Sequence, residues 1–341
     1  MTMRPLAIRR VGLVTAVGSD ASSSCAAFRA KTTNPGQTPF MDSTGEWIAA
    51  HQVWPEAGER GIAKLARMAA TAIEEALDGL PKGQWADIPL LLCVAESERV
   101  GRPENLDIDI FEQIEALTGA RFAPTSGIVP YGRVGVAVAL AQAAQRVEAG
   151  VCSHALVAAT DGLLDWHALM HYDREDRLLT RENSNGFMPG EGAGALLVGP
   201  PGGDDELLCT GIGFAVEPAP IASGEPLRGD GLSNAILSAL AQTGQTMHAF
   251  DYRIADLSGE QYYFKEAALA LLRTLRTTKE EFDLWHPAEC TGEAGALAGA
   301  AIIALADAAC RKGYGKGPNI VAHMANDGGQ RAALTLEYRR A

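Results

Sequence analysis

Residues 185–198 read NGFMPGEGAGALLV, a glycine-rich run that passes directly into apolar residues. A dinucleotide-binding loop of similar composition needs a strand before it and a helix after it. Here residues 195–199, ALLVG, follow with the pattern of a strand. The run therefore argues against a nucleotide site, and it predicts a strand over residues 193–198 that closes the first part of the chain.

The segments on either side of this strand follow the same order. Each part has a strand, a helix, a second strand, a helix rich in small residues and two closing strands, and the turn-rich residues 199–206 link the parts. We predict an α/β fold with a mostly parallel sheet, in which two pseudo-repeated halves, residues 1–200 and 201–341, form a five-layer α-β-α-β-α sandwich. The alternative is one doubly wound domain with a long insertion. The paired segments are 8–17 and 207–216, 67–80 and 234–243, 88–95 and 252–257, 135–149 and 295–311, 155–159 and 319–323, and 193–198 and 331–338.

The composition is that of an ordinary globular protein, 47% hydrophobic and 21% charged over 341 residues. With 29 basic and 42 acidic residues the net charge is −13, and Lys and Arg are not clustered, which argues against binding to nucleic acid or to an anionic membrane. No apolar run approaches the length of a membrane span. Residues 9–17 faintly resemble a signal peptide, but they are interrupted and no cleavage site follows, so we expect a first strand and a cytoplasmic protein.

The cysteines and histidines show no metal-binding pattern. The six cysteines are scattered without a CxxC pair, which predicts reduced and mostly buried thiols. His167 and His171 are spaced to share one face of a helix, as metal-binding pairs do, but no third ligand follows at a suitable spacing. We favour an amphipathic segment over a pocket mouth, in which His171 and Tyr172 pack locally, and expect neither a metal nor a cofactor. The charged run 174–182 is predicted to be a solvated loop.

Four segments in order resemble the β-ketoacyl synthase branch of the thiolase superfamily. This resemblance implies the thiolase fold and a homodimer in which the first-half sheets join. It also implies an active site with a cysteine at a helix N-terminus, where the helix dipole favours the thiolate, and two histidines that donate to a thioester oxygen. The four segments are 185–198, 11–18 (VGLVTAVG), 290–306 (CTGEAGALAGAAIIALA) and 326–337 (NDGGQRAALTLE).

The residues at these implied positions differ from those of the family. The nucleophile position falls near Arg133, and no cysteine occurs between Cys93 and Cys152. The histidine positions hold Asp256 and Glu293. We therefore expect no catalytic residue at the former catalytic positions, which also include Asp327 where the family has a gating phenylalanine. The family lysine before the second histidine aligns with Ala288.

Buried acids need a cation, and an arginine at a helix N-terminus needs acids. We therefore predict that Arg133, Asp256, Glu293 and Asp327 form an ion-pair network that fills the former acyl site. The sharper alternative is that Asp256 and Glu293 form a new acid–base pair. The hydroxyls nearest the nucleophile position, on Thr125, Ser126 and Tyr131, lack an evident base and are poor substitutes for a thiolate.

The predicted function is that of a catalytically inactive synthase-like protein, acting as a homodimeric binding, scaffold or accessory protein. Similar short chains are encoded beside bacterial type VI secretion genes, so one candidate client is a secreted effector. An acyl carrier protein is another candidate, although the acidic net charge disfavours an acidic partner. The alternatives are a dead partner subunit of an active synthase, in the arrangement of a chain-length factor, and a 3-oxoacyl-ACP synthase-type acyltransferase with a non-standard site.

Overall fold

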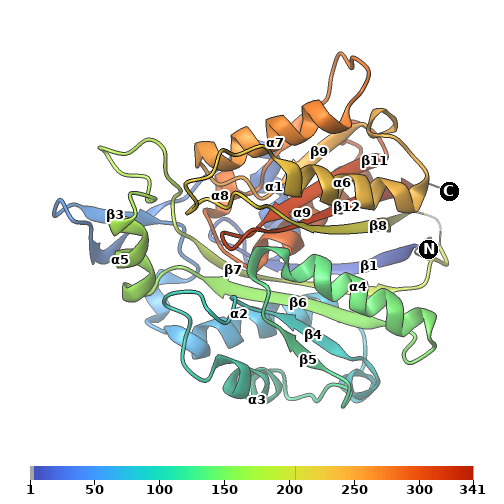
Figure 1. Cartoon of the computed structure of the whole chain (residues 1–341). Coiled ribbons are helices and arrows are strands. Elements are labelled where there is room, and N and C mark those ends of the chain that lie inside the picture. The colour runs from blue at the N-terminus through green and yellow to red at the C-terminus, as the bar shows by residue number, and fades with distance from the viewer. Residues whose placement is uncertain (1–3, 204, 341) are drawn as a thin grey trace.

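The computed structural model describes residues 4–203 and 205–340, and its large sheet contains ten strands (Figure 1). They are β1 (Leu6–Val14), β4 (Leu90–Cys93), β5 (Gly127–Val129), β6 (Ala155–Gly162), β7 (Glu191–Gly199), β8 (Glu206–Val216), β9 (Tyr252–Ala255), β10 (Leu284–Trp285), β11 (Asn319–Ala325) and β12 (Gln330–Arg339). Outward from the centre, the order is β1-β7-β6-β4-β5 on one side and β8-β12-β11-β9-β10 on the other. Each half therefore repeats the same strand order, as predicted.

The sheet is mixed, and its parallel pairs lie in its outer parts. Strand β4 is parallel to both β5 and β6, and β9 is parallel to both β10 and β11, as the alternation of strands and helices predicts. The central pairs, from β6–β7 through to β11–β12, are antiparallel. Strands β1 and β8 pair only from Leu6↔Cys209 to Ile8↔Leu207, so the two halves meet along a short seam.

Helices cover both outer faces of the strands and fill the space between the halves (Figure 1). Helices α2 (Gly61–Ala76) and α3 (Leu106–Thr118) pack on the outer face of the first half, and α6 (Asp230–Thr243) and α7 (Gln261–Thr274) on that of the second. The central helices α4 (Gly135–Glu148) and α9 (Leu297–Arg311) contact strands of both halves. The predicted five-layer α-β-α-β-α sandwich is confirmed.

The small residues of the two central helices allow this layer to be thin. Gly299 of α9 lies against α4, where an added Cβ would come within 2.6 Å of the Val136 Cβ. Residues such as Ala137 and Ala300 are almost fully buried, so no bulky side chain holds the helices apart. Both helices begin near the same end of the molecule, where loops from both halves meet.

The remaining elements are short. The second, two-stranded sheet is a hairpin of β2 (Gly36–Met41) and β3 (Trp47–Ala50). The other helices are α1 (Ala21–Ala30), α5 (Trp166–Arg174) and α8 (Ala288–Thr291), and the 3₁₀ turns are η1 (Pro55–Ala57), η2 (Lys82–Asp87), η3 (Gly132–Val134) and η4 (Met247–Ala249). The predicted linker 199–206 joins β7 to β8, and its residue Asp204 lies outside the described residues. Within residues 4–203 and 205–340, no helix combines the length and apolar character needed to cross a membrane.

Candidate functional site

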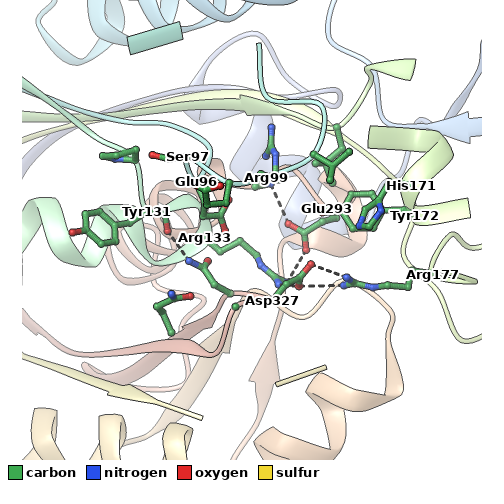
Figure 2. A pocket seen from close by; sticks show the side chains of 18 of the residues that line it. Glu96, Ser97, Arg99, Tyr131, Arg133, His171, Tyr172, Arg177, Glu293 and Asp327 are labelled. Atoms are coloured by element: carbon green, nitrogen blue, oxygen red, sulfur yellow. Dashed lines mark hydrogen bonds and ion pairs between the residues drawn. The ribbon is translucent and has the colours of Figure 1, made fainter. Parts of the chain in front are cut away.

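A cavity of about 630 Å³ lies where loops of the two halves meet beside the start of α4 (Figure 2). First-half residues such as Glu96 and Arg133 line it together with second-half residues such as Glu293 and Asp327. The resemblance predicts the active site at this place. Of the four positions that the resemblance implies to be former catalytic positions, all but Asp256 line the cavity.

Arg133 lies in the 3₁₀ turn η3 directly before α4, and only 7% of it is exposed. Its Nη1 donates to Glu293 Oε2 at 3.1 Å, and its Nη2 donates to Asp327 Oδ1 at 2.5 Å and to the Tyr263 hydroxyl at 2.8 Å. The guanidinium also lies over the Tyr263 ring, 4.7 Å from its centroid. A cation is disfavoured at a helix N-terminus, and here two carboxylates offset that cost. The structure thus joins three of the four predicted network members.

Arg177 is a second cation of this network, which the sequence analysis missed. It donates to both carboxylate oxygens of Asp327, at 2.7 and 3.1 Å, and to both of Glu260, at 2.7 and 2.9 Å. The prediction that residues 174–182 form a solvated loop is therefore wrong at Arg177, whose side chain is 15% exposed. The sequence of a segment with mixed charges does not indicate which of its residues will pack against a buried acid in the folded protein.

The two carboxylates of the network respond in opposite directions to their surroundings. Burial alone would raise the pKa of Asp327, but Arg133 and Arg177 together hold it well below its usual range. Burial raises the pKa of Glu293 to about 7, although Arg133 and a hydrogen bond from Ser258 Oγ at 2.9 Å favour its ionised form. Glu293 therefore titrates near neutral pH, whereas Asp327 stays ionised.

Asp256 lies beside this network without joining it. It follows β9, is 5% exposed, and its Oδ2 accepts a hydrogen bond from the Ala325 backbone amide at 2.8 Å. Burial raises its pKa, and nearby Arg133 opposes that shift. Asp256 is close enough to Glu293 for its charge to disfavour the ionised form of Glu293. The predicted acid–base pair stays a prediction.

A neighbouring ion pair at the start of α9 was also missed. Arg99 Nη1 donates to Asp161 Oδ2 at 2.7 Å, and the same oxygen accepts a hydrogen bond from the Ala296 backbone amide at 2.9 Å. Asp161 stands near the carboxyl end of β6, and an acid at the end of a strand is a signal that sequence reasoning can use. Glu96, which follows β4, faces the same cavity, and burial raises its pKa.

Cys93 is poorly placed for nucleophilic catalysis, and the hydroxyls of Ser126 and Tyr131 differ in their surroundings. Cys93 is fully buried beneath the start of α4, and burial raises the pKa of its thiol. None of the residues 4–203 and 205–340 that line the cavity is a cysteine. The Ser126 hydroxyl is engaged with the backbone of Leu90 and Ala123, and Tyr131 lines the cavity with 46% of its surface exposed.

The two histidines of α5 have different surroundings. His167 is exposed and its Nδ1 lies 3.2 Å from Asp165, whereas His171 packs against Tyr172 and lines the cavity. In the described part of the chain, no group of three or more His, Cys, Asp or Glu residues is arranged to hold a metal ion. The local-packing interpretation of His171 is confirmed by its 5.2 Å ring contact with Tyr172.

No family model matches the sequence, and no curated protein matches it significantly. Solved structures do match. A chain of a type II PKS acyl-carrier protein in complex with its ketosynthase bound to the hexaketide aligns with 99% of this chain and 100% of its own length, at a TM-score of 0.80 and 14% identity. The ishigamide ketosynthase/chain length factor aligns over 98% and 99% (TM-score 0.76, 16% identity). The ketosynthase from module 1 of the bacillaene synthase of Bacillus amyloliquefaciens FZB42 aligns over 99% and 73% (TM-score 0.74, 15% identity). The chain therefore has the thiolase-type fold of the ketosynthases.

Proposed function

We propose that this protein is a non-catalytic ketosynthase-like protein that binds another molecule through the surface around its former active site. The observation that carries the proposal is the position of Arg133. Its guanidinium lies where the resemblance places the nucleophile and is tied to Glu293 and Asp327. An arginine cannot hold an acyl group as a thioester, and carboxylates repel the enolate that the family histidines stabilise.

The direct test is intact-protein mass spectrometry after incubation with a panel of acyl-CoA and acyl-carrier thioesters. We expect no stoichiometric adduct on the wild-type protein. An adduct mapped to the segment 120–135 would instead support the alternative of an acyltransferase with a non-standard site. An active ketosynthase treated in the same way provides the positive control for the thioesters.

A closed cavity would also prevent acylation, so the test needs a variant that reports access. Arg133→Cys places a thiol at the proposed nucleophile position while the rest of the cavity is retained. Acylation of R133C, together with an unmodified wild-type protein, would show that the wild type lacks a nucleophile rather than an entrance. Circular dichroism and gel filtration establish that R133C is folded, and modification of R133C by iodoacetamide provides a second measure of access.

We further propose that the protein forms a homodimer through the edge of its first half. Strand β5 lies at the end of the sheet order, so its outer edge has no strand beside it within the described residues. Light scattering of the protein expressed alone is expected to give twice the chain mass. We also propose that residues 1–200 and 201–341 are the two halves of each subunit. The seam between β1 and β8 would then lie inside a subunit and not at the dimer interface.

A dead partner subunit is the second candidate function. It is favoured by the match to a ketosynthase/chain length factor structure over 99% of that chain. Such a subunit would be monomeric or unstable when expressed alone and would become stable on co-expression with its ketosynthase. A secreted effector and an acyl carrier protein are the client classes to test by pull-down, and a stable dimer that retains one of them would favour the binding or accessory role.

A further inference from the structure

The cavity beside α4 is lined by apolar, polar and acidic residues, and its exposed lining residues include Ser97 and Glu98 as well as two apolar ones. Val100 and Tyr131 line it and remain 43% and 46% exposed, which places both at the opening. The carboxylates of Glu96, Glu293 and Asp327 lie around the Arg133 side chain (Figure 2). Apolar side chains beside an acidic group can recognise a charged head on an apolar stem.

Charges inside and around the cavity do not balance. The guanidiniums of Arg99, Arg133 and Arg177 are engaged in ion pairs with Asp161, Glu260, Glu293 and Asp327. Two further carboxyls, those of Glu96 and Asp256, lie close enough to Arg133 for its charge to favour their ionised forms. Neither forms an ion pair with any of the three arginines. Fully ionised, the group would hold three more negative than positive charges, and buried charges of one sign are costly without a counter-ion.

Glu96 is the carboxylate that the network leaves open to a ligand. The two nearest guanidiniums donate to other groups, Arg99 to Asp161 and Gly162 and Arg133 to the second-half residues described above. Among the described residues, Glu96 therefore has no ion-pair partner within bonding distance. Its position is well defined, because Gly132 (φ +49°) packs against it so closely that an added Cβ would come within 2.2 Å of the carboxylate.

The titration of the acids is consistent with a missing cation. Burial raises the pKa of Glu96 and of Glu293, the latter to about 7, so each holds a proton to a higher pH than an exposed carboxyl does. The charged groups that face Glu96 are Arg99, Asp161 and Arg133. Those that face Glu293 are Arg133, Asp256 and Asp327, together with the Ser258 hydroxyl. A cation placed beside Glu96 would stabilise its ionised form and release a proton.

We propose that this cavity binds a cationic ligand, a primary ammonium, amidinium or guanidinium on an apolar stem, with its charge held by Glu96. The inference rests on the proposed non-catalytic binding function and names the chemistry of the ligand. The net charge of −13 favours approach of such a cation. The same chemistry is offered by a small free amine and by the lysine or arginine side chain of a peptide.

Calorimetric titration with benzamidine, whose amidinium stands on an aromatic ring, provides the first test. Benzamide is the neutral control of the same shape. Because a charge-assisted hydrogen bond is roughly twice as strong as a neutral one, we expect benzamidine to bind at least about tenfold more tightly. Titration in two buffers of different ionisation heat should show proton release on binding at pH 7. Equal binding of the two compounds, or binding of neither at millimolar concentration, would overturn the proposal.

Glu96→Gln removes the open carboxylate and keeps its shape. We expect E96Q to lose the preference for benzamidine over benzamide and to weaken benzamidine binding about tenfold or more. The matched control is Glu104→Gln, which removes one charge from an exposed glutamate that does not line the cavity and should change the affinity less than about twofold. Unfolding curves establish that both variants are folded, and benzamidine binding to E96Q at the wild-type affinity would contradict the assignment.

Titration with peptides distinguishes the two sources of the cation, a small free amine and the side chain of a peptide. Acetyl-Gly-Leu-Arg-amide is compared with the same peptide carrying citrulline, a neutral analogue of arginine. Tighter binding of the arginine peptide than of benzamidine supports a protein client, and weaker but arginine-selective binding supports a small amine. An acyl adduct in the thioester experiment would defeat the non-catalytic function and leave the cation selectivity standing, so the two proposals can fail separately.

Discussion

The two central helices begin beside the same cavity with opposite charges at their N-termini. At α9, Asp161 accepts a hydrogen bond from the Ala296 amide at 2.9 Å and Glu293 accepts one from the Gly295 amide at 3.1 Å, as the helix dipole favours. At α4, Arg133 stands in the turn before the helix, with the charge that the dipole disfavours. The Arg133–Glu293 ion pair connects the two ends, so an acid at the start of one helix compensates the cation at the start of the other. The ion pair at the cavity therefore also connects the two helices of the central layer of the fold.

The largest expected effect comes from breaking this connection. Arg133→Met leaves the buried Glu293 without its ion-pair partner and Asp327 with Arg177 alone, and we expect the free energy of unfolding to fall by about 3–5 kcal/mol. Urea unfolding measures the change. The control is Arg181→Met, which removes an arginine whose side chain is 85% exposed and should cost less than about 0.5 kcal/mol.

A double variant sharpens the result for Arg133. If the Arg133–Glu293 pair is coupled, Arg133→Met combined with Glu293→Gln should be more stable than the sum of the two single losses predicts, by about 1–3 kcal/mol. Simple additivity in urea unfolding would show that the two helix ends are independent and would contradict the comparison drawn above.

The acid at the start of α9 is expected to have the next largest effect. Asp161→Asn keeps the shape of the side chain but removes the charge that pairs with Arg99, so we expect a loss of about 2–3 kcal/mol in unfolding free energy. Asp165→Asn is the matched control, because Asp165 caps α5 from an exposed position and should cost about 1 kcal/mol or less. Equal losses in the two variants would mean that the burial of Asp161 at the start of α9 does not increase its contribution to the free energy of unfolding.

The pH dependence of stability tests the titration of Glu293. Its pKa is about 7 in the folded protein and near 4.5 when unfolded, so the folded state holds the proton more tightly between these values. The free energy of unfolding should therefore fall as the pH rises from about 5 to 7, by about 2 kcal/mol from this group, and level off above. Glu293→Gln should flatten this part of the curve. Glu266, whose pKa is also about 7, remains in both proteins, so parallel curves would contradict the assignment to Glu293.

The smallest expected effect concerns Arg177 and the segment that carries it. Arg177→Met removes the contacts to Glu260 and Asp327. Asp327 keeps Arg133, so the loss falls mainly on the Arg177–Glu260 pair, and we expect about 1–2 kcal/mol. Limited proteolysis should cut residues 174–186 faster. Arg174→Met, an exposed arginine of the same segment, is the control, and similar cleavage rates for the two variants would show that Arg177 does not hold the segment.

Three of the four predicted site residues could be placed correctly from the sequence. Glycine runs and apolar segments recur in a fixed order, so a resemblance to the ketosynthases placed Arg133, Glu293 and Asp327 at one site before any geometry was known. The structure brings these three within hydrogen-bonding distance. Asp256 was placed near the same site, but its carboxylate accepts from the Ala325 amide instead, a choice that depends on the local backbone.

The sequence by itself determined the layered α/β fold, because periodic apolar segments and small-residue helices have few ways to bury their surfaces. Only the tertiary structure decided which charges meet. Arg177 and Glu260 are 83 positions apart and Arg99 and Asp161 62 apart, and nothing local to either residue specifies its partner. Burial decides the strength of such pairs and raises the pKa of the acids, and burial is a property of the assembled layers. The short-range pattern therefore specifies the layers, and the packing of the layers specifies the charges at the cavity.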